Sequence, residues 1–164
     1  MPGCFLRVGA REPGGPVVAA HVAELATGRS WEELVETRIF EPLGMKDAVF
    51  GRPEHLKERF ATIYNVNADG GLVPSNALDA PGSATRVLGG FSISTTAADY
   101  GRFAEMLVNS GELDGVRLLS RKTIDLMASD HLPEGVTRGA AGGGAAGGEG
   151  YGRGVRVVTN PAQA

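Results

Sequence analysis

SWEELVETRIFEPLGMK, residues 30–46, is the stretch of this sequence that says most about its fold. Ser30 followed by Glu33 is the capping-box pattern that begins a helix. Apolar side chains then recur at helical spacing, at Trp31, Leu34, Val35 and Ile39. Pro42 and Gly44 are typical of the end of a helix. The stretch therefore predicts one amphipathic helix that stops at a proline and a glycine.

A second informative stretch begins at Ser94 and reads STTAADY over residues 94–100. Thr95 or Thr96 is expected to cap a second amphipathic helix, and Gly111 is expected to stop it. Further along, Asp114-Gly115 predicts a tight turn. Ser120 is expected to cap another helix that continues to about residue 128. The apolar stripe of the second helix consists of Tyr100, Phe103, Ala104, Leu107 and Val108.

The two stretches, in this order and at this spacing, resemble the serine β-lactamase-like family. Its members are class C β-lactamases, D-alanyl-D-alanine carboxypeptidases and the related family VIII carboxylesterases. The matching residues are Thr27-Gly28-Arg29-Ser30, Ile39–Met45, Ser94–Tyr100, Arg102-Phe103, Gly111-Glu112-Leu113 and Leu118-Leu119-Ser120. The resemblance implies an α+β fold. We expect the mostly helical portion of a β-lactamase/penicillin-binding-like fold, with a few short strands and an incomplete sheet.

The same resemblance implies a serine hydrolase that cleaves a small-molecule ester or β-lactam through an acyl-enzyme, with no metal or organic cofactor. The family's chemistry depends on Ser-x-x-Lys, whose lysine takes the proton of the serine. None of the eight serines has a lysine three places later. Tyr-x-Asn and His-x-Gly or Lys-Thr-Gly are also absent. No catalytic residue is therefore assigned, and whether this chain is itself an enzyme stays open.

Three interpretations follow from these absences. The favoured one is part of a β-lactamase-related hydrolase that begins after the first two motifs, stops short of the third, and is inactive alone. The alternative is a non-catalytic β-lactamase-fold binding or interaction module. The third is an enzyme with an unrelated site built from Ser92, His131 or Tyr151.

The chain divides into an atypical N-terminal segment, residues 1–16, and a partial hydrolase domain, residues 17–164. Within that domain a glycine-rich stretch, residues 135–150, is predicted to be a flexible loop. Residues 74–90 are rich in Pro, Gly and Ser and predict a surface loop. Other expected elements are helices at Val17–Ala26 and Pro53–Phe60, a hairpin of Ala61–Val66 with Leu72–Val73, and a strand at Tyr151–Thr159.

Candidate site residues are few, and each has a plainer interpretation. Gly90-Phe91-Ser92-Ile93-Ser94 resembles a nucleophile elbow, but Ser94 replaces its last glycine. Through the family resemblance, Gly89, Gly90, Phe91 and Ser92 are expected at the rim of a substrate pocket; the alternative is an ordinary loop. The glycines at 142, 144 and 147 match a dinucleotide fingerprint by letter but lie inside low-complexity sequence.

Histidines offer little further chemistry. His21 falls on the apolar stripe of its helix and is expected to be a core or boundary residue. Asp130-His131 and Ser120 would form a triad only if the fold brought them within hydrogen-bonding distance, which sequence adjacency does not supply. No spacing of His, Cys, Asp or Glu suggests a metal site.

Composition limits the partners. The net charge is −3, which gives no electrostatic reason to expect nucleic acid. No run of about 18 apolar residues predicts a membrane span, and no signal segment is present, so cytoplasmic location is the default expectation. Cys4 is the single cysteine. Self-association is expected through an uncovered apolar face, with the Trp31/Leu34/Val35/Ile39 and Tyr100/Phe103/Leu107 stripes as candidates.

Overall fold

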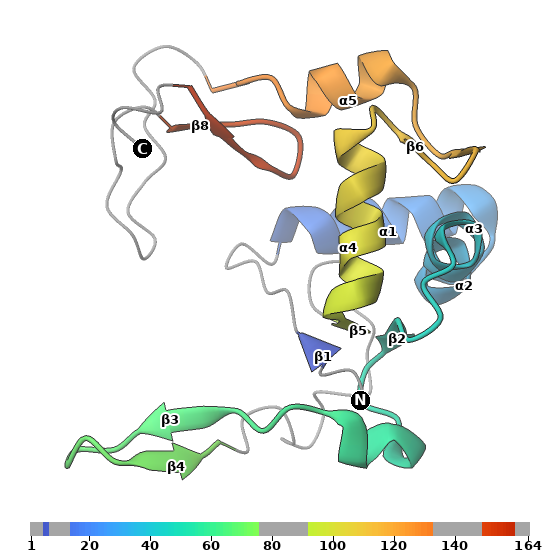
Figure 1. Ribbon diagram of the computed structural model, residues 1–164. Coiled ribbons are helices and arrows are strands. Elements are labelled where there is room, and N and C mark those ends of the chain that lie inside the picture. The colour runs from blue at the N-terminus through green and yellow to red at the C-terminus, as the bar shows by residue number, and fades with distance from the viewer. Residues whose placement is uncertain (1–4, 7–13, 76–91, 133–148, 160–164) are drawn as a thin grey trace. The chain divides into compact units, whose positions relative to one another are not determined.

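The computed structural model describes residues 5–6, 14–75, 92–132 and 149–159 (Figure 1). Contacts between backbone positions divide the chain into two compact units, Met1–Phe103 and Ala104–Ala164. Helix α4 (Ala97–Val108) begins in the first unit and ends in the second. Each unit is described by itself below. Helices and short antiparallel strands make up both units, so the fold is α+β as predicted.

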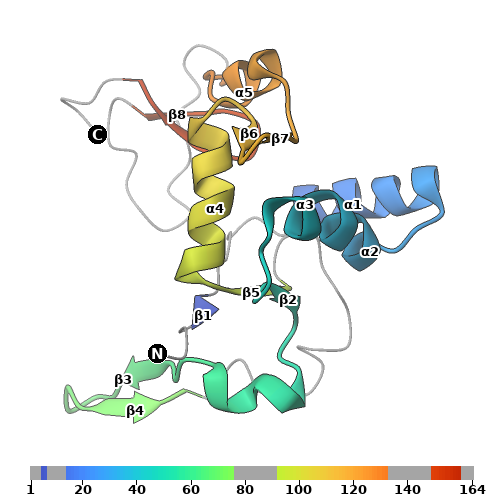
Figure 2. The same cartoon turned by 45° about the vertical axis from the view of Figure 1, so that its right-hand side comes forward.

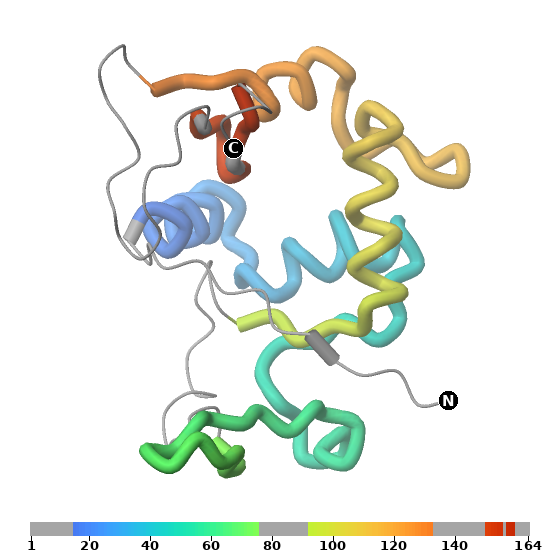
Figure 3. Tube along the Cα trace, turned by 60° about the vertical axis from the view of Figure 1, so that its left-hand side comes forward, coloured from blue at the N-terminus to red at the C-terminus, as the bar shows by residue number. Residues whose placement is uncertain are grey.

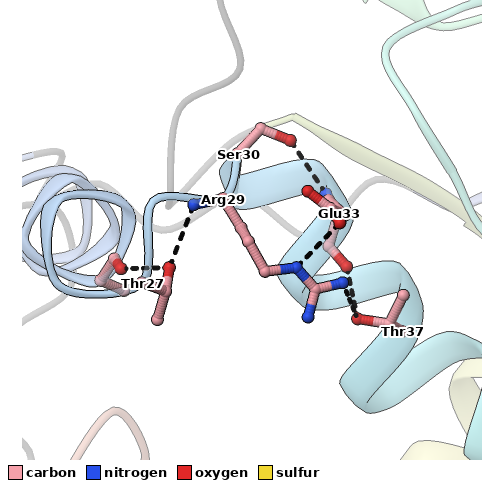
Figure 4. A network of polar contacts seen from close by, with 6 residues as sticks. Thr27, Arg29, Ser30, Glu33 and Thr37 are labelled. Carbon is pink, nitrogen blue, oxygen red and sulfur yellow. Dashed lines mark hydrogen bonds and ion pairs between the residues drawn. The ribbon is translucent and has the colours of Figure 1, made fainter.

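The first unit contains a run of helices. These are α1 (Gly14–Thr27), α2 (Trp31–Val35), the π-helical turn η1 (Glu36–Phe40) and α3 (Glu41–Leu43). Ser30 caps α2 as predicted, since its Oγ accepts a hydrogen bond from the backbone N–H of Glu33 at 3.2 Å. The Glu33 carboxylate turns instead to Arg29, whose Nε lies 2.8 Å away (Figure 4).

The predicted single helix from Ser30 is interrupted by η1. The N–H of Glu41 bonds to the carbonyl of Glu36, five residues back, which widens the turn. Proline has no N–H with which to continue the ladder at the next position. The helix ends as predicted at Gly44, whose φ of 65° is left-handed. Met45 N bonds to Phe40 O at 2.9 Å and Gly44 N to Glu41 O at 3.0 Å, the Schellman pattern.

The core of the first unit lies under α2, η1 and α3. Its buried side chains are Leu34, Val35, Phe40, Leu43 and Met45, and the Phe40 ring packs on Phe50 at 5.8 Å between centroids. The α2–η1 stripe is mainly a core stripe and not an uncovered face, because Leu34 and Val35 are only 7% and 3% exposed and Trp31 and Ile39 are half-buried.

Helix α1 is oriented contrary to the expectation for His21. The side chain of His21 is exposed, and its Nδ1 lies 3.2 Å from the Glu24 carboxylate. Ala20 is the buried residue of α1, at 5% exposure. Because α1 packs through the side that carries Ala20, the stripe with Val18, Val22 and Leu25 faces solvent.

A three-stranded antiparallel sheet joins distant parts of the first unit (Figure 2). The central strand is β5 (Ile93–Thr96), flanked by β1 (Phe5–Leu6) and β2 (Val49–Phe50). Phe5 pairs with Thr96, and Val49 pairs with Ser94. The strand β5 was not predicted because its four residues are mostly hydroxyl-bearing and precede a helix directly. Part of the atypical N-terminal segment therefore pairs with the second informative stretch.

A hairpin completes the first unit (Figure 3, green). The 3₁₀ helix η2 (Glu54–Arg59) precedes strands β3 (Tyr64–Val66) and β4 (Leu72–Pro74), which pair antiparallel. The hairpin and the short helix are confirmed. All six strand residues are exposed.

The second unit contains the end of α4, a hairpin of β6 (Glu112–Leu113) with β7 (Val116–Arg117), and α5 (Arg121–Met127). The turn at Asp114-Gly115 is confirmed, with φ of 50° and 79°, as is the Ser120 cap of α5, whose Oγ accepts from Thr123 N at 3.1 Å. The single strand predicted at Tyr151–Thr159 is wrong. Strands β8 (Glu149–Tyr151) and β9 (Arg156–Val158) form a hairpin, because Gly152 N bonds to Val155 O at 2.8 Å and Gly154 is left-handed.

The predicted loops at 74–90 and 135–150 lie mostly outside the described residues. Among the helices that the structure describes, none is long and apolar enough to cross a membrane.

Candidate functional site

The two informative stretches meet at a buried carboxylate. Asp99, in the first turn of α4, is 8% exposed, and its Oδ2 accepts the backbone N–H of Asp47 at 2.6 Å. Its own N–H donates to the hydroxyl of Thr96 at 3.2 Å, which caps α4 as predicted. Thr96-Ala97-Ala98-Asp99 has the [ST]-x-x-[DE] pattern, so the cap could be read from sequence. The contact with Asp47, 52 residues away, could not.

Arg102, one turn further along α4, makes the second connection. Its Nε donates to the carbonyl of Leu43 at the end of α3. That carbonyl belongs to the last turn of a helix and has no partner further along it. The guanidinium passes 3.7 Å from the position that a Cβ would occupy on Gly44. One charged side chain therefore closes the end of α3 and fixes α4 beside it.

Asp47 extends this network to η2. Its Oδ1 lies 2.7 Å from Nη1 of Arg59. The hydrogen bond from this guanidinium, with its positive charge, lowers the pKa of the Asp47 carboxyl, and the same contact raises the pKa of Arg59. Both groups are therefore charged near neutral pH, and neither is suited to exchange a proton there.

The Asp47–Asp99–Arg102 network is structural by its chemistry. Its oxygen and nitrogen atoms are used for backbone N–H groups, a backbone carbonyl and a charged pair. Thr95, 3% exposed, donates its hydroxyl to a backbone carbonyl at 3.4 Å. Hydrogen bonds from Asp99 and Arg102 thus join the two stretches that carry the family resemblance.

The predicted pocket rim is only partly described. Gly89, Gly90 and Phe91 lie outside the described residues, and Ser92 directly precedes β5. The carbonyl of Ser92 accepts the N–H of Gly51 at 2.7 Å, and the hydroxyl of Ser94 donates to the Gly51 carbonyl at 2.8 Å. These two bonds fasten β5 to the end of β2. Ser94 therefore serves as a strand contact, whereas Gly90 and Phe91 of the elbow-like pattern lie outside the described residues.

The residues of the imagined triad serve local structure in the second unit. Ser120 Oγ bonds to the backbone and hydroxyl of Thr123. His131 Nε2 lies 2.7 Å from the Leu126 carbonyl, at the end of α5. Asp130 Oδ1 accepts the N–H groups of Leu132 and Tyr151, each at 3.0 Å, and these bonds lower the pKa of Asp130. Each side chain is already engaged, so no triad forms from them.

Within the described residues, no group of three or more His, Cys, Asp or Glu side chains could hold a metal ion. Four of the described serines use their hydroxyls in a similar way. Ser30, Ser94, Ser120 and Ser129 use their hydroxyls for helix caps, a strand contact and a helix carbonyl. The structure thus shows hydroxyls that stabilise turns and termini.

The sequence model of the β-lactamase family matches residues 14–163, which include the Asp47–Asp99–Arg102 network and most of both units. The chain belongs to the β-lactamase family. The match begins at the first residue of α1 and spans nearly all of the chain.

Similar proteins agree with this assignment. Protein Rv1367c of Mycobacterium tuberculosis is 33% identical over 136 residues, which are 80% of this chain and 33% of that protein. Penicillin-binding protein 4 of Amycolatopsis lactamdurans is 31% identical over 118 residues, 69% of this chain and 29% of that protein. The solved structure of the simvastatin synthase LovD of Aspergillus terreus is 25% identical with a TM-score of 0.72, over 85% of this chain and 38% of that chain.

The chain spans about a third of the length of the curated relatives it matches. The family match confirms the family predicted from sequence, and the described helices and short strands confirm the fold class. The likeness to the LovD structure agrees with the α+β fold class.

Proposed function

We propose that this chain is part of a serine hydrolase that cleaves an ester or a β-lactam through an acyl-enzyme, and that it is inactive by itself. One observation carries the proposal: a β-lactamase-family chain contains none of the three motifs that supply nucleophile, proton relay and acyl-site strand. An unactivated serine hydroxyl is a weak nucleophile. The hydroxyls of Ser30, Ser94, Ser120 and Ser129, which cap or fasten backbone, support this interpretation.

Two further expectations belong to the same proposal. Residues 17–164 form one partial hydrolase domain, which is supported by a family match that extends across both compact units. Gly89, Gly90, Phe91 and Ser92 form a rim of the substrate pocket. The bonds that fasten Ser92 and Ser94 to Gly51 support the second expectation, because they give the stretch that follows Phe91 a fixed anchor.

The first test uses the isolated chain. We expect no hydrolysis of short p-nitrophenyl esters, no hydrolysis of nitrocefin, and no stoichiometric labelling of any serine by a fluorophosphonate probe. Stoichiometric modification of one serine would show an activated nucleophile and contradict the proposal.

The second test restores the missing motifs. A hybrid joins Rv1367c, without its 136 matched residues, to the matching residues of this chain in the same order. The added parts are chosen or edited so that they contain Ser-x-x-Lys, Tyr-x-Asn and His-x-Gly. Ester hydrolysis should then appear, and it should disappear when the serine of Ser-x-x-Lys is changed to alanine. In that hybrid, Phe91→Ala should mainly alter KM or substrate preference. A folded but inert hybrid would favour a non-catalytic interaction module.

The interaction module has an observation of its own. One face of the β3–β4 hairpin presents Tyr64 and Val66 opposite Pro74 and Leu72, and these side chains are exposed. Val66 and Leu72 are each 69% exposed. Contiguous exposed apolar side chains mark interaction sites. This surface supports the second candidate function independently of any catalytic motif.

A further inference from the structure

Helix α1 carries its apolar stripe on the outside. Val18, Val22 and Leu25 are spaced four and three residues apart, so they share one face of the helix. Their exposed fractions are 63%, 57% and 74%. Ala20, two residues before Val22, lies about 200° around the helix axis and is 5% exposed. The helix therefore packs through a small side chain and leaves its large ones uncovered.

An ordinary amphipathic surface helix buries its apolar stripe and exposes its polar one, and α1 does the opposite. From Gly14 to Ala20 the helix has no charged residue. The next polar side chains of the helix, His21 and Glu24, lie 3.2 Å apart, and Glu24 also accepts the backbone N–H of Trp31 at 2.9 Å. The outer face is thus uncharged and three side chains long, which suits burial against another apolar surface.

The comparisons with similar proteins indicate which surface covers the outer face of α1. The family match begins at residue 14, which is the first residue of α1. The matched residues make up 33% of Rv1367c, so most of that relative has no counterpart in the match. A helix at the border of the matched region, with an uncovered apolar face, is where the rest of such a domain would pack.

We propose that the outer face of α1, formed by Val18, Val22 and Leu25, is the docking surface for the remainder of a β-lactamase-family domain. This inference rests on the proposed function and names the partner that completes it. The partner segment presents an apolar surface along Val18, Val22 and Leu25.

The test uses the hybrid with Rv1367c and measures folding, so it is independent of activity. We compare Val18→Glu and Val22→Glu with Val108→Glu, the same chemical change at a valine of α4 that is 83% exposed. A carboxylate forced into an apolar contact is strongly disfavoured. The two α1 variants should lower the thermal midpoint of the hybrid by about 10 °C or prevent folding, and Val108→Glu should shift it by at most about 2 °C.

A binding experiment keeps the proposal testable if the hybrid does not fold. The full chain with Cys4→Ser and Val22→Cys is labelled with an environment-sensitive dye, and the purified remainder of Rv1367c is added. A saturable blue shift, absent for the same dye at Val108→Cys, supports docking at α1. The proposal is overturned by an unfolded hybrid together with no dye response, or by a folded hybrid in which the α1 variants behave like Val108→Glu. A folded, inert hybrid with sensitive α1 variants would contradict only the hydrolase function.

Discussion

At the level of single residues, Asp99 carries the connection between the two family stretches. Replacing it by alanine removes the acceptor for Asp47 N–H in a site where the carboxylate is 8% exposed. A buried donor left without its acceptor costs about 1–3 kcal/mol. Asp99→Ala should therefore lower the urea midpoint and speed hydrogen exchange of the Asp47 amide.

The matched control for Asp99 is Asp125→Ala, an exposed position on α5. It should change the free energy of unfolding, measured by urea denaturation, by no more than about 0.5 kcal/mol. Equal effects of the two substitutions would show that the Asp99 bond is weak in solution.

Asp130 gives the second residue-scale prediction, which concerns pH. The backbone N–H groups of Leu132 and Tyr151 lower the pKa of Asp130 below its ordinary 3.8. A lowered folded-state pKa contributes stability that is present above about pH 4 and is lost as the pH falls through the lowered value. The amide of Tyr151 should thus become less protected from hydrogen exchange in that acidic window. Asp130→Asn should remove this pH dependence, and its persistence in the variant would contradict the assignment.

At the scale of elements, the stop after α4 depends on Gly111. Its φ is 94°, and a methyl group at this position would overlap the carbonyl oxygen of Leu119. Left-handed backbone disfavours a Cβ by about 1–2 kcal/mol, to which the overlap adds. Gly111→Ala should lower the free energy of unfolding, measured by urea denaturation, by more than about 2 kcal/mol.

Gly101, inside α4, is the control for this glycine. A methyl group there would meet no heavy atom within 4 Å. Because alanine favours a helix interior over glycine, Gly101→Ala should stabilise by about 0.5–1 kcal/mol. Opposite signs for the two glycines are the expected result, and a stabilising Gly111→Ala would contradict it.

Elements whose ends have local signals were predictable from sequence. Ser30 and Ser120 each cap a helix by accepting a backbone N–H three residues away, and Asp114-Gly115 turns by its own dihedral preferences. Strand β5 exists because distant strands β1 and β2 pair with it. Such pairing leaves little trace in four residues. The strand expected at Tyr151–Thr159 was wrong for a related reason, since its glycines reverse the chain.

In the candidate site, too, local contacts were predictable from sequence and long-range contacts were not. The cap of α4 by Thr96 is a local pattern, whereas the bonds from Asp99 to Asp47 and from Arg102 to Leu43 span 52 and 59 residues. The family resemblance pointed to the right stretches, and the structure shows that they fasten helices together. The pocket rim at Gly89–Ser92 stays a prediction, because its first three residues lie outside the described structure.

On the scale of the whole molecule, the family could be read from two stretches because they encode the contacts that define this part of the fold. Burial could not be read in the same way. Periodicity showed that α1 has an apolar stripe, but only packing decides which side of a helix is covered. Here the covered side carries Ala20, and the large side chains Val18, Val22 and Leu25 are exposed.

The last prediction follows from that exposure. Burying a Val or Leu side chain contributes on the order of 1.5–3 kcal/mol. Two copies that cover each other's α1 stripe are therefore lower in free energy than two separate copies whose stripes face water. In the absence of a partner domain, the isolated chain should show concentration-dependent association by sedimentation velocity and should bind an apolar dye. A chain with Val18→Glu, Val22→Glu and Leu25→Glu should sediment as a monomer at the same concentrations, whereas Val108→Glu should associate like the original. A monomeric original chain without dye binding would contradict this prediction.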